Sequence, residues 1–203
     1  MEAHPESYRV HQLAGEVFEA QGKSEQAIKE YRLALQQNPR IPQLHYRCGQ
    51  QLLQQADPDS QKQALQEFQA ELAVDPQAAP AEYALGEVYR SQQDLQQAAQ
   101  HYARATEMDR QYAGPHIGLA QVLLALHSPE KAQPEAEAAI RLDPNNTAAH
   151  YTLMLAYREQ RKMAEAGQEM AVFQRLQEES SKSFTTKLHS LLNGENSEKR
   201  APQ

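Results

Sequence analysis

Apolar residues recur along this chain at the spacing of an α-helix. Between residues 8 and 41, one run places Leu13, Val17 and Phe18 on one side of a helix. A second run follows at i, i+4, i+7 and i+8, with Ala27, Tyr31, Ala34 and Leu35. This spacing favours amphipathic helices over strands, in which apolar and polar residues would alternate. The segment therefore predicts two helices, each with an apolar stripe that needs a partner.

The same helix pair recurs down the chain. An alanine returns at intervals of 37, 34, 34 and 34 residues, at Ala27, Ala64, Ala98, Ala132 and Ala166. Mostly small residues precede these alanines by twelve positions, or fifteen in the second unit: Gly15, Gly49, Gly86, Ala120 and Met154. A fixed period of this length is typical of stacked helical repeats. Neighbouring units must stack because one helix pair cannot bury its apolar face alone.

Turn and capping signals separate the predicted helices. Asn38-Pro39, Asp75-Pro76 and Asp143-Pro144 are sequences that a helix does not cross easily. Candidate N-caps stand where the second helix of a unit should begin, at Ser24, Ser60, Asp94 and Ser128. Pro129 follows the last of these and suits the first helical position.

These units resemble the tetratricopeptide repeat. The third unit carries the pattern most fully, with Leu85-Gly86, Tyr89, Ala98, Tyr102 and Ala105, and the first has Gly15, Phe18, Ala27, Tyr31, Ala34 and Pro39. Five units cover most of the chain: 8–41, 42–78, 79–112, 113–146 and 147–180. The resemblance implies an all-α fold, a right-handed superhelix, or solenoid, of five helix pairs.

Two units depart from the pattern. The second is three residues longer than the others, and its excess lies between Gly49 and Ala64, so we expect an insertion in the turn near 57–59. The fourth has Ala136 in place of the aromatic residue and Pro134 in the interior of its second helix. An interior proline removes a hydrogen bond and clashes with the preceding turn, which predicts a distorted or late-starting helix there.

The two ends of the stack differ. After the fifth unit, apolar residues at i, i+4, i+7 and i+8 predict a capping helix over 181–192, followed by a disordered tail over 193–203: Phe184, Leu188, Leu191 and Leu192. Too few residues precede the first unit for a covering helix. Val10, Leu13, Ala14 and Val17 are therefore expected to leave an apolar edge on the first helix. Either the natural protein extends further upstream, or this edge binds a second copy or another partner.

Composition narrows the classes of function. A formal net charge of −7 argues against a nucleic-acid partner, which would require a basic surface. No apolar run is long enough to cross a membrane, and no apolar signal segment begins the chain, so a cytoplasmic location is expected. Catalytic motifs and metal-binding cysteine spacings are absent, and the single cysteine, Cys48, falls in a core column. We expect no enzymatic activity and no cofactor.

Histidine recurs in one column of the repeat. His11, His45, His116 and His150 share it, and Glu82 takes their place in the third unit. Histidine commonly binds metals. Residues one repeat apart, however, lie about 10 Å from each other when helices pack side by side, whereas zinc needs ligands at about 2 Å. We interpret the column as packing and predict no metal site.

Three columns of the first helices are the candidate binding residues. In the tetratricopeptide family the column of Tyr46, Tyr83, Ile117 and Tyr151 faces the concave surface of the superhelix. The next turns of these helices add amides and charges, so the predicted groove residues are Tyr46, Gln50, Tyr83, Glu87, Arg90, Ile117, Gln121, Tyr151 and Arg158. Tyrosine offers a large contact area and a hydroxyl at low entropic cost, which suits protein recognition.

Three hypotheses for function remain open from the sequence. The first is a non-catalytic scaffold or adaptor that binds a peptide or helix of a partner protein in its concave groove. The second is a regulatory or substrate-docking module of a larger enzyme. The third is a self-assembly module that associates through its exposed first helix. The sequence does not name the partner, because the fold does not determine the binding specificity.

Overall fold

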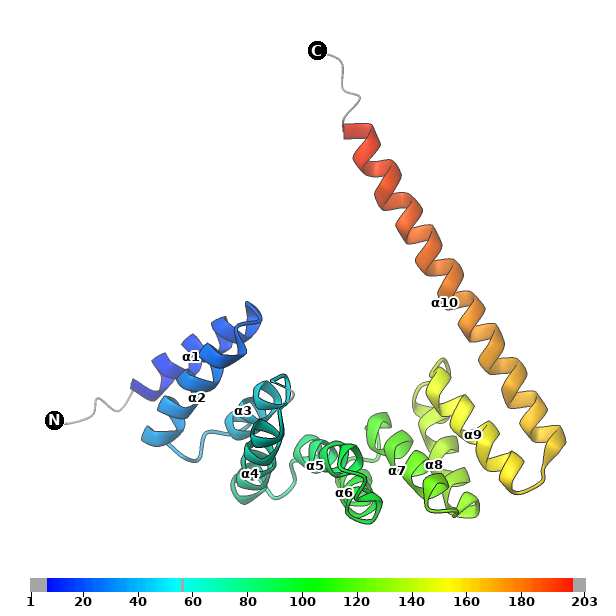
Figure 1. The fold of residues 1–203 in the computed structure, drawn as a ribbon, viewed down its shortest axis with the longest axis horizontal. Coiled ribbons are helices and arrows are strands. Elements are labelled where there is room, and N and C mark those ends of the chain that lie inside the picture. The colour runs from blue at the N-terminus through cyan, green and yellow to red at the C-terminus, as the bar shows by residue number, and fades with distance from the viewer. Residues whose placement is uncertain (1–6, 56, 199–203) are drawn as a thin grey trace.

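The computed structural model describes residues 7–55 and 57–198, which form ten α-helices and no strand (Figure 1). Their bounds are α1 Ser7–Ala20, α2 Ser24–Gln37, α3 Leu44–Leu53, α4 Pro58–Val74, α5 Ala79–Ser91, α6 Leu95–Met108, α7 Ala113–Ala125, α8 Pro129–Leu142, α9 Thr147–Glu159 and α10 Met163–Glu198. The prediction of an all-α solenoid of helix pairs is confirmed.

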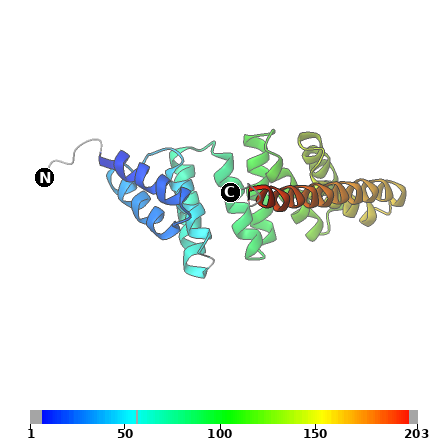
Figure 2. The same cartoon turned by 90° about the horizontal axis from the view of Figure 1, so that it is seen from above.

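The helices pair in chain order and the pairs stack into an arc. Each odd-numbered helix packs against the helix that follows it, and each pair then packs on the next. In Figure 1 the odd-numbered helices α1, α3 and α5 lie on the inner side of the arc, and α2, α4 and α6 lie on its outer side. We call the odd-numbered set the inner helices and the even-numbered set the outer helices. Figure 2 shows that the pairs follow one another along a single direction.

Within a pair, a glycine of the inner helix faces an aromatic ring of the outer helix. A Cβ placed on Gly86 would lie 2.6 Å from the ring of Tyr102, and the same holds for Gly49 against Phe68. At Gly15 the nearest ring atoms of Tyr31 would lie at 2.4 Å. All three rings are fully buried. The glycines are required because any side chain at these positions would overlap the ring.

In the last two pairs both partners of this contact are different residues. In the fourth pair Ala120 stands where the glycines stand and Ala136 where the rings stand, and both are fully buried in one cluster. In the fifth pair Met154 and Met170 take the two positions. The residue types at the two positions thus change together: glycine with an aromatic ring, alanine with alanine, and methionine with methionine. This explains why the small-residue column of the sequence weakens in step with the aromatic column.

The three-residue insertion of the second unit lengthens a helix and not the turn. The other outer helices begin three residues before their repeat alanine, whereas α4 begins at Pro58, six residues before Ala64. Asp57 caps this extra turn by accepting a hydrogen bond from the backbone N–H of Ser60 at 2.9 Å. Ser60 is thus inside the helix and is not its cap. A proline at the first helical position after a capping aspartate starts a helix readily, which is why the insertion is helical.

The distortion predicted for the fourth outer helix is wrong in its main point. α8 begins at Pro129 and continues without interruption through Pro134 to Leu142. Pro134 is exposed, so its ring lies on the outside of the stack. The backbone carbonyl of Glu130, which loses its intrahelical donor, belongs to an exposed residue where water can bind it. The helix therefore accommodates the proline without a late start.

The separate capping helix predicted for 181–192 is also wrong. α10 runs as one helix from Met163 to Glu198 and leaves the stack as a straight extension (Figure 1). No proline or glycine lies between Gly167 and Gly194 to stop the helix, which explains the continuity. The tail predicted as disordered begins at 193, but residues 193–198 are helical, and the rest of that prediction lies outside the described residues.

Two glycine substitutions should change stability in opposite directions. Gly86→Ala should destabilise the protein by about 1–3 kcal/mol, because the new methyl group overlaps the buried Tyr102 ring. Gly167→Ala should stabilise it by up to about 1 kcal/mol, because nothing lies within 4 Å of a Cβ at this helical position. Urea unfolding followed by circular dichroism measures both. A neutral or stabilising Gly86→Ala would contradict the packing described.

Candidate functional site

The predicted groove residues all lie on inner helices. α3 carries Tyr46 and Gln50, α5 carries Tyr83, Glu87 and Arg90, α7 carries Ile117 and Gln121, and α9 carries Tyr151 and Arg158. The structure thus distributes the nine residues over four neighbouring helices. Gln50 and Tyr151 are exposed, and the Gln50 amide donates a 2.8 Å hydrogen bond to the hydroxyl oxygen of Tyr46.

An aromatic cluster occupies the middle of this surface. The ring of Tyr83 lies 5.2 Å from that of Tyr112 and 5.8 Å from that of Tyr102, measured between centroids. Tyr46 packs on Phe68 at 5.8 Å. Burial, together with the neighbouring phenols of Tyr46 and Tyr83, raises the pKa of Tyr112 to about 12. Tyr46, Tyr83 and Tyr112 are half-buried, so part of each ring remains on the surface.

Sequence reasoning missed Tyr112, which the structure adds to the predicted residues. It precedes α7 in the loop between the third and fourth pairs and acts as the N-cap residue of that helix. Gly114 follows it, and a Cβ there would lie 3.2 Å from the Tyr112 ring and 3.4 Å from the Tyr83 ring. The signal in the sequence was this glycine, which breaks the repeat pattern and leaves room for the two rings.

Two charged groups of the groove, Glu87 and Arg90, are already paired with each other. Arg90 donates from Nη2 to the Glu87 carboxylate at 2.6 Å and from Nε to the Tyr102 hydroxyl oxygen at 3.1 Å. The hydroxyl of Tyr102 in turn donates to Glu87. Hydrogen bonding to Glu87 raises the pKa of Arg90, and burial raises the pKa of Tyr102. Both side chains therefore stay protonated, and the pair adds no net charge to the surface.

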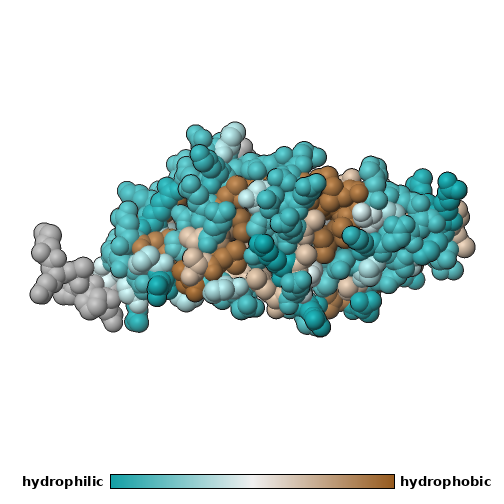
Figure 3. All heavy atoms as spheres, turned by 90° about the horizontal axis from the view of Figure 1, so that it is seen from below, coloured by the Kyte–Doolittle hydropathy of each residue, from teal (hydrophilic) through white to brown (hydrophobic). Residues whose placement is uncertain are grey.

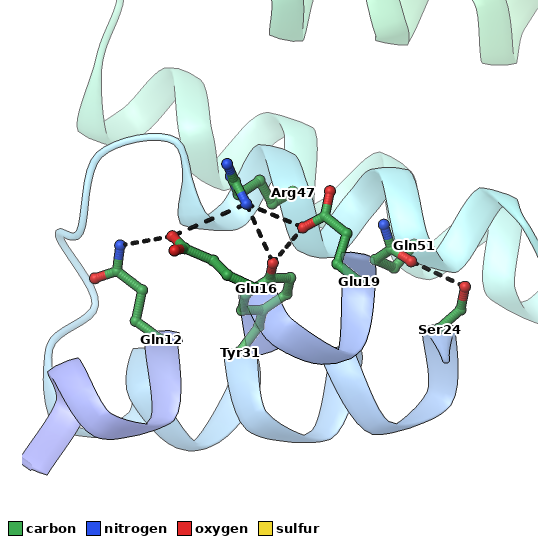
Figure 4. A network of polar contacts seen from close by, with 7 residues as sticks. All are labelled: Gln12, Glu16, Glu19, Ser24, Tyr31, Arg47 and Gln51. Carbon is green, nitrogen blue, oxygen red and sulfur yellow. Dashed lines mark hydrogen bonds and ion pairs between the residues drawn. The ribbon is translucent and has the colours of Figure 1, made fainter. Parts of the chain in front are cut away.

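A similar network closes the joint between the first two pairs (Figure 4). Arg47 of α3 donates to Glu19 of α1 at 3.1 Å and lies 3.9 Å from Glu16. The buried Tyr31 hydroxyl donates to Glu19 and accepts from Arg47 at 3.4 Å. Gln12 completes the chain of contacts by donating to Glu16 at 3.2 Å. These groups hold two repeats together instead of offering a strong charge to a ligand.

The fourth and fifth pairs supply the apolar end of the groove. Ile117 and Gln121 of α7 are half-buried. The Tyr151 ring is 44% exposed and contacts Phe173 of α10, with centroids 5.4 Å apart. Arg158 is exposed near the end of α9. From α3 to α9 the predicted groove residues are thus aromatic and aliphatic side chains interspersed with amides and a few charged groups.

Each helix pair also contains one histidine–glutamate pair. The Nδ1 atom of the histidine lies within hydrogen-bonding distance of a glutamate Oε2 on the partner helix: His11–Glu30 at 2.7 Å, His45–Glu67 at 2.6 Å, His116–Glu135 at 2.7 Å and His150–Glu169 at 2.6 Å. The histidine column predicted as packing therefore packs through a specific acidic partner. Among the residues that the structure describes, no three metal-ligating side chains come together.

The third pair keeps this interaction with its members exchanged. Glu82 occupies the inner-helix position, and His101 of α6 binds it at 2.5 Å through Nδ1. Glu82 is buried, so the hydrogen bond offsets the cost of placing its carboxylate there. The sequence contained the signal, because acid and histidine stand nineteen residues apart in four units and twenty-two in the lengthened second unit. A search of the histidine column alone could not reveal it.

Two further features bear on chemistry. Burial raises the pKa of the Cys48 thiol to about 12, so this group stays protonated and unreactive. Across 7–55 and 57–198, none of the helices combines the length and the apolar character that crossing a bilayer requires.

The outer side of the arc carries apolar patches between polar ones (Figure 3). A hollow of about 590 Å³ lies between α6, α7 and α8, with Ala103, Leu123 and Pro134 in its lining. A second hollow, of about 400 Å³, lies between α2 and α4. Both are shallow gaps between successive outer helices and contain none of the predicted groove residues.

Comparison with known proteins identifies the repeat. Residues 8–41 match one sequence profile described as tetratricopeptide repeat, and residues 49–113 and 117–182 match another with the same description. The chain belongs to the tetratricopeptide repeat family. Tetratricopeptide arrays are generally non-catalytic scaffolds for protein–protein interaction, and membership of the family supports that general role for this chain.

Similar proteins share the architecture at low sequence identity. A crystal structure of MamA protein is 21% identical, with a TM-score of 0.77, over 88% of this chain and 96% of that one. A structure of pilF from Pseudomonas aeruginosa is 22% identical, with a TM-score of 0.70, over 84% of this chain and 76% of that one. At these identities the likeness concerns the fold alone.

A curated relative is anaphase-promoting complex subunit 3 of Schizosaccharomyces pombe, 26% identical over 150 residues, or 74% of this chain. The alignment spans 22% of that relative, so the tetratricopeptide chain corresponds to about a fifth of its length.

Swapping the positions of Glu82 and His101 in the third helix pair tests the histidine–glutamate interaction. Glu82→His alone should destabilise the protein by about 1–3 kcal/mol, because it leaves His101 without its acceptor in a buried site. The double exchange Glu82→His with His101→Glu should recover most of that loss, because the other four pairs already have this order. Denaturant unfolding of both variants and wild type gives the comparison. A double variant less stable than Glu82→His would show that the pair is not interchangeable.

The pair at His45 should make stability depend on pH. Its Nδ1 faces Glu67 and its Nε2 lies 3.1 Å from the carbonyl oxygen of Pro39, so both nitrogens face acceptors. The hydrogen bond to Glu67 raises the pKa of His45 above its ordinary 6.5. The stabilisation is therefore complete below the unfolded-state pKa and is lost as pH rises through the higher folded-state pKa.

A His45→Gln variant measures the pH-dependent stabilisation that the His45–Glu67 pair contributes. Its melting temperature should fall furthest below that of wild type on the acid side of pH 6.5, and the gap should narrow toward pH 9. His127→Gln, which changes an exposed histidine outside the five pairs, is the matched control and should leave the melting temperature close to that of wild type. A gap for His45→Gln that widens as pH rises would reverse the assigned sign.

Proposed function

We propose that the concave surface of this tetratricopeptide array binds a segment of a partner protein along α3, α5, α7 and α9. The observation that supports this most is the continuous row of partly exposed tyrosine and aliphatic side chains that starts at Tyr46 and ends at Tyr151. The stack already satisfies its internal packing, yet these rings keep part of their surface open. Tyrosine-rich surfaces of this kind are typical of protein recognition sites.

The paired charges indicate the chemistry of the ligand. Arg90 is bound to Glu87, and Arg47 is bound to Glu19 in the first joint. A strongly acidic or basic peptide would have to compete with these internal partners, which costs part of its binding energy. A segment with apolar or aromatic side chains that also satisfies the amides Gln50 and Gln121 fits the surface better. An extended peptide and one face of an amphipathic helix both meet this requirement.

Paired double variants test the location of binding. Gln50→Arg with Gln121→Arg adds two positive charges to the concave side at positions that are exposed or half-buried. Gln66→Arg with Gln96→Arg adds the same charge at exposed sites of the outer helices α4 and α6 and is the matched control. Partners captured from a lysate by wild type should be lost with the first variant and retained by the second.

A third variant tests whether the tyrosine side chains bind the partner, without adding charge to the surface. Tyr46→Ala with Tyr83→Ala and Tyr151→Ala removes the aromatic contacts and should weaken capture at least tenfold, since tyrosines at the centre of an interface carry most of its binding energy. Circular dichroism must first show that its helical content and unfolding cooperativity match those of wild type. Equal capture by the wild type and both groove variants would place the partner elsewhere, with the outer hollows as the next surface to vary.

A further inference from the structure

Within residues 7–55 and 57–198, no helix packs on the outward, apolar side of α1. Val10, Leu13 and Val17 lie at i, i+3 and i+7, which places them on one side of the helix. They are 66%, 61% and 54% exposed, respectively. Such a row on one helix is unusual for a surface in contact with water.

This face is the one that every later inner helix uses to pack on the pair before it. The residues at the position of Val10 in later repeats include Leu44, Ala81 and Ala149, which are 0–1% exposed. Those at the position of Val17 include Val88, Val122 and Ala156, which are also buried. In each case the preceding outer helix covers the face. The α1 face is therefore a repeat-to-repeat joint with one side open.

The opposite end of the array leaves the complementary face open. Met170 of α10 occupies the position of Tyr31, Phe68, Tyr102 and Ala136, which are all fully buried, but it is 38% exposed. Met163, two turns earlier, is 63% exposed, and a Cβ on Gly167 between them would meet no atom within 4 Å. At the internal joints the next inner helix covers this side of an outer helix. Here that cover is absent from the described residues.

An internal joint shows how the two open faces would fit. The ring of Tyr102 lies against Gly118, whose Cβ would be 2.7 Å from it. Tyr102 stands at the position of Met170, and Gly118 stands at the position of Leu13. A second copy placed in the same register would bring its Leu13 onto Met170. At the internal joint a glycine makes room for a tyrosine ring. At the proposed joint the flexible side chain of Met170 can adapt its shape to Leu13.

We propose that the chain associates head to tail, with the outer face of α1 of one copy packed on the outer face of α10 of the next. The two faces differ, so the contact is heterologous and does not close into a dimer; it extends into a series of copies. One helix-pair joint is smaller than a standard stable interface, so the association should be weak and depend on concentration. This interaction uses the ends of the array and leaves the concave groove open.

Analytical ultracentrifugation of single and mixed variants tests the proposal. The weight-average mass of wild type should rise above 22.9 kDa with concentration, without a limit at the dimer. Leu13→Glu and Met170→Glu should each remain monomeric, because each loses one of the two faces. Their equimolar mixture should form one-to-one pairs and nothing larger, because each variant keeps the face that the other lacks. Leu126→Glu, an exposed leucine within the array, is the control and should behave as wild type.

Other outcomes would overturn the proposal. A wild type that stays at 22.9 kDa at every concentration means that the α1 face is not covered by a second copy. A Met170→Glu variant that still dimerises, while Leu13→Glu does not and mixing restores nothing, means that two α1 faces meet each other. Both substituted positions are exposed, so unchanged melting curves are expected and show that the loss of association is not a loss of folding.

Discussion

The structure depends on the contact between a small residue of an inner helix and the buried side chain of the outer helix that faces it, which is clearest in the first three pairs. Where the inner residue is Gly15, Gly49 or Gly86, the outer residue is a buried aromatic ring, and the helices approach closely around it. This contact sets the geometry of the pair, and the pairs then stack in one direction. The same rings carry the hydroxyls of Tyr31 and Tyr102 toward the groove, where arginine and glutamate bind them. Packing inside a repeat thus determines which charges are left for a ligand.

Much of the fold could be predicted because the pattern repeats. A single helix pair would have been ambiguous, but an alanine column that returns five times, with glycine in the second column of the first three units, fixes the helix type and the pairing. Local exceptions were harder to judge. A proline such as Pro134 usually breaks a helix, but here the carbonyl that loses its donor is exposed to water. The insertion before Ser60 was expected to lengthen a turn, but Asp57 caps it as an extra helical turn. The end of α10 could not be predicted, because an amphipathic segment without breakers continues or folds back depending on what it packs against.

The site was predicted less completely than the fold. The tyrosine column pointed to the concave surface, but Tyr112 lies outside the repeat pattern and joins the cluster only through the loop before α7. Glu87 and Arg90 were candidates for contact with a ligand, and the structure shows that each is the other's partner. The histidine–glutamate pairs escaped notice because the third pair has its members exchanged. An interaction between the two helices of one repeat joins two repeat positions. It is found only when the residues at both positions are compared across the repeats.

The central claim is that partners bind on the concave side of this tetratricopeptide array. Site-specific photocrosslinking tests it directly, with a benzophenone amino acid placed at Gln50 or Gln121 on the inner helices, or at Gln66 or Gln96 on the outer helices. Binding on the concave side should give covalent adducts with the same partner from both inner positions and none from the outer positions. Adducts that form at the outer positions, with none at Gln50 and Gln121, would contradict it.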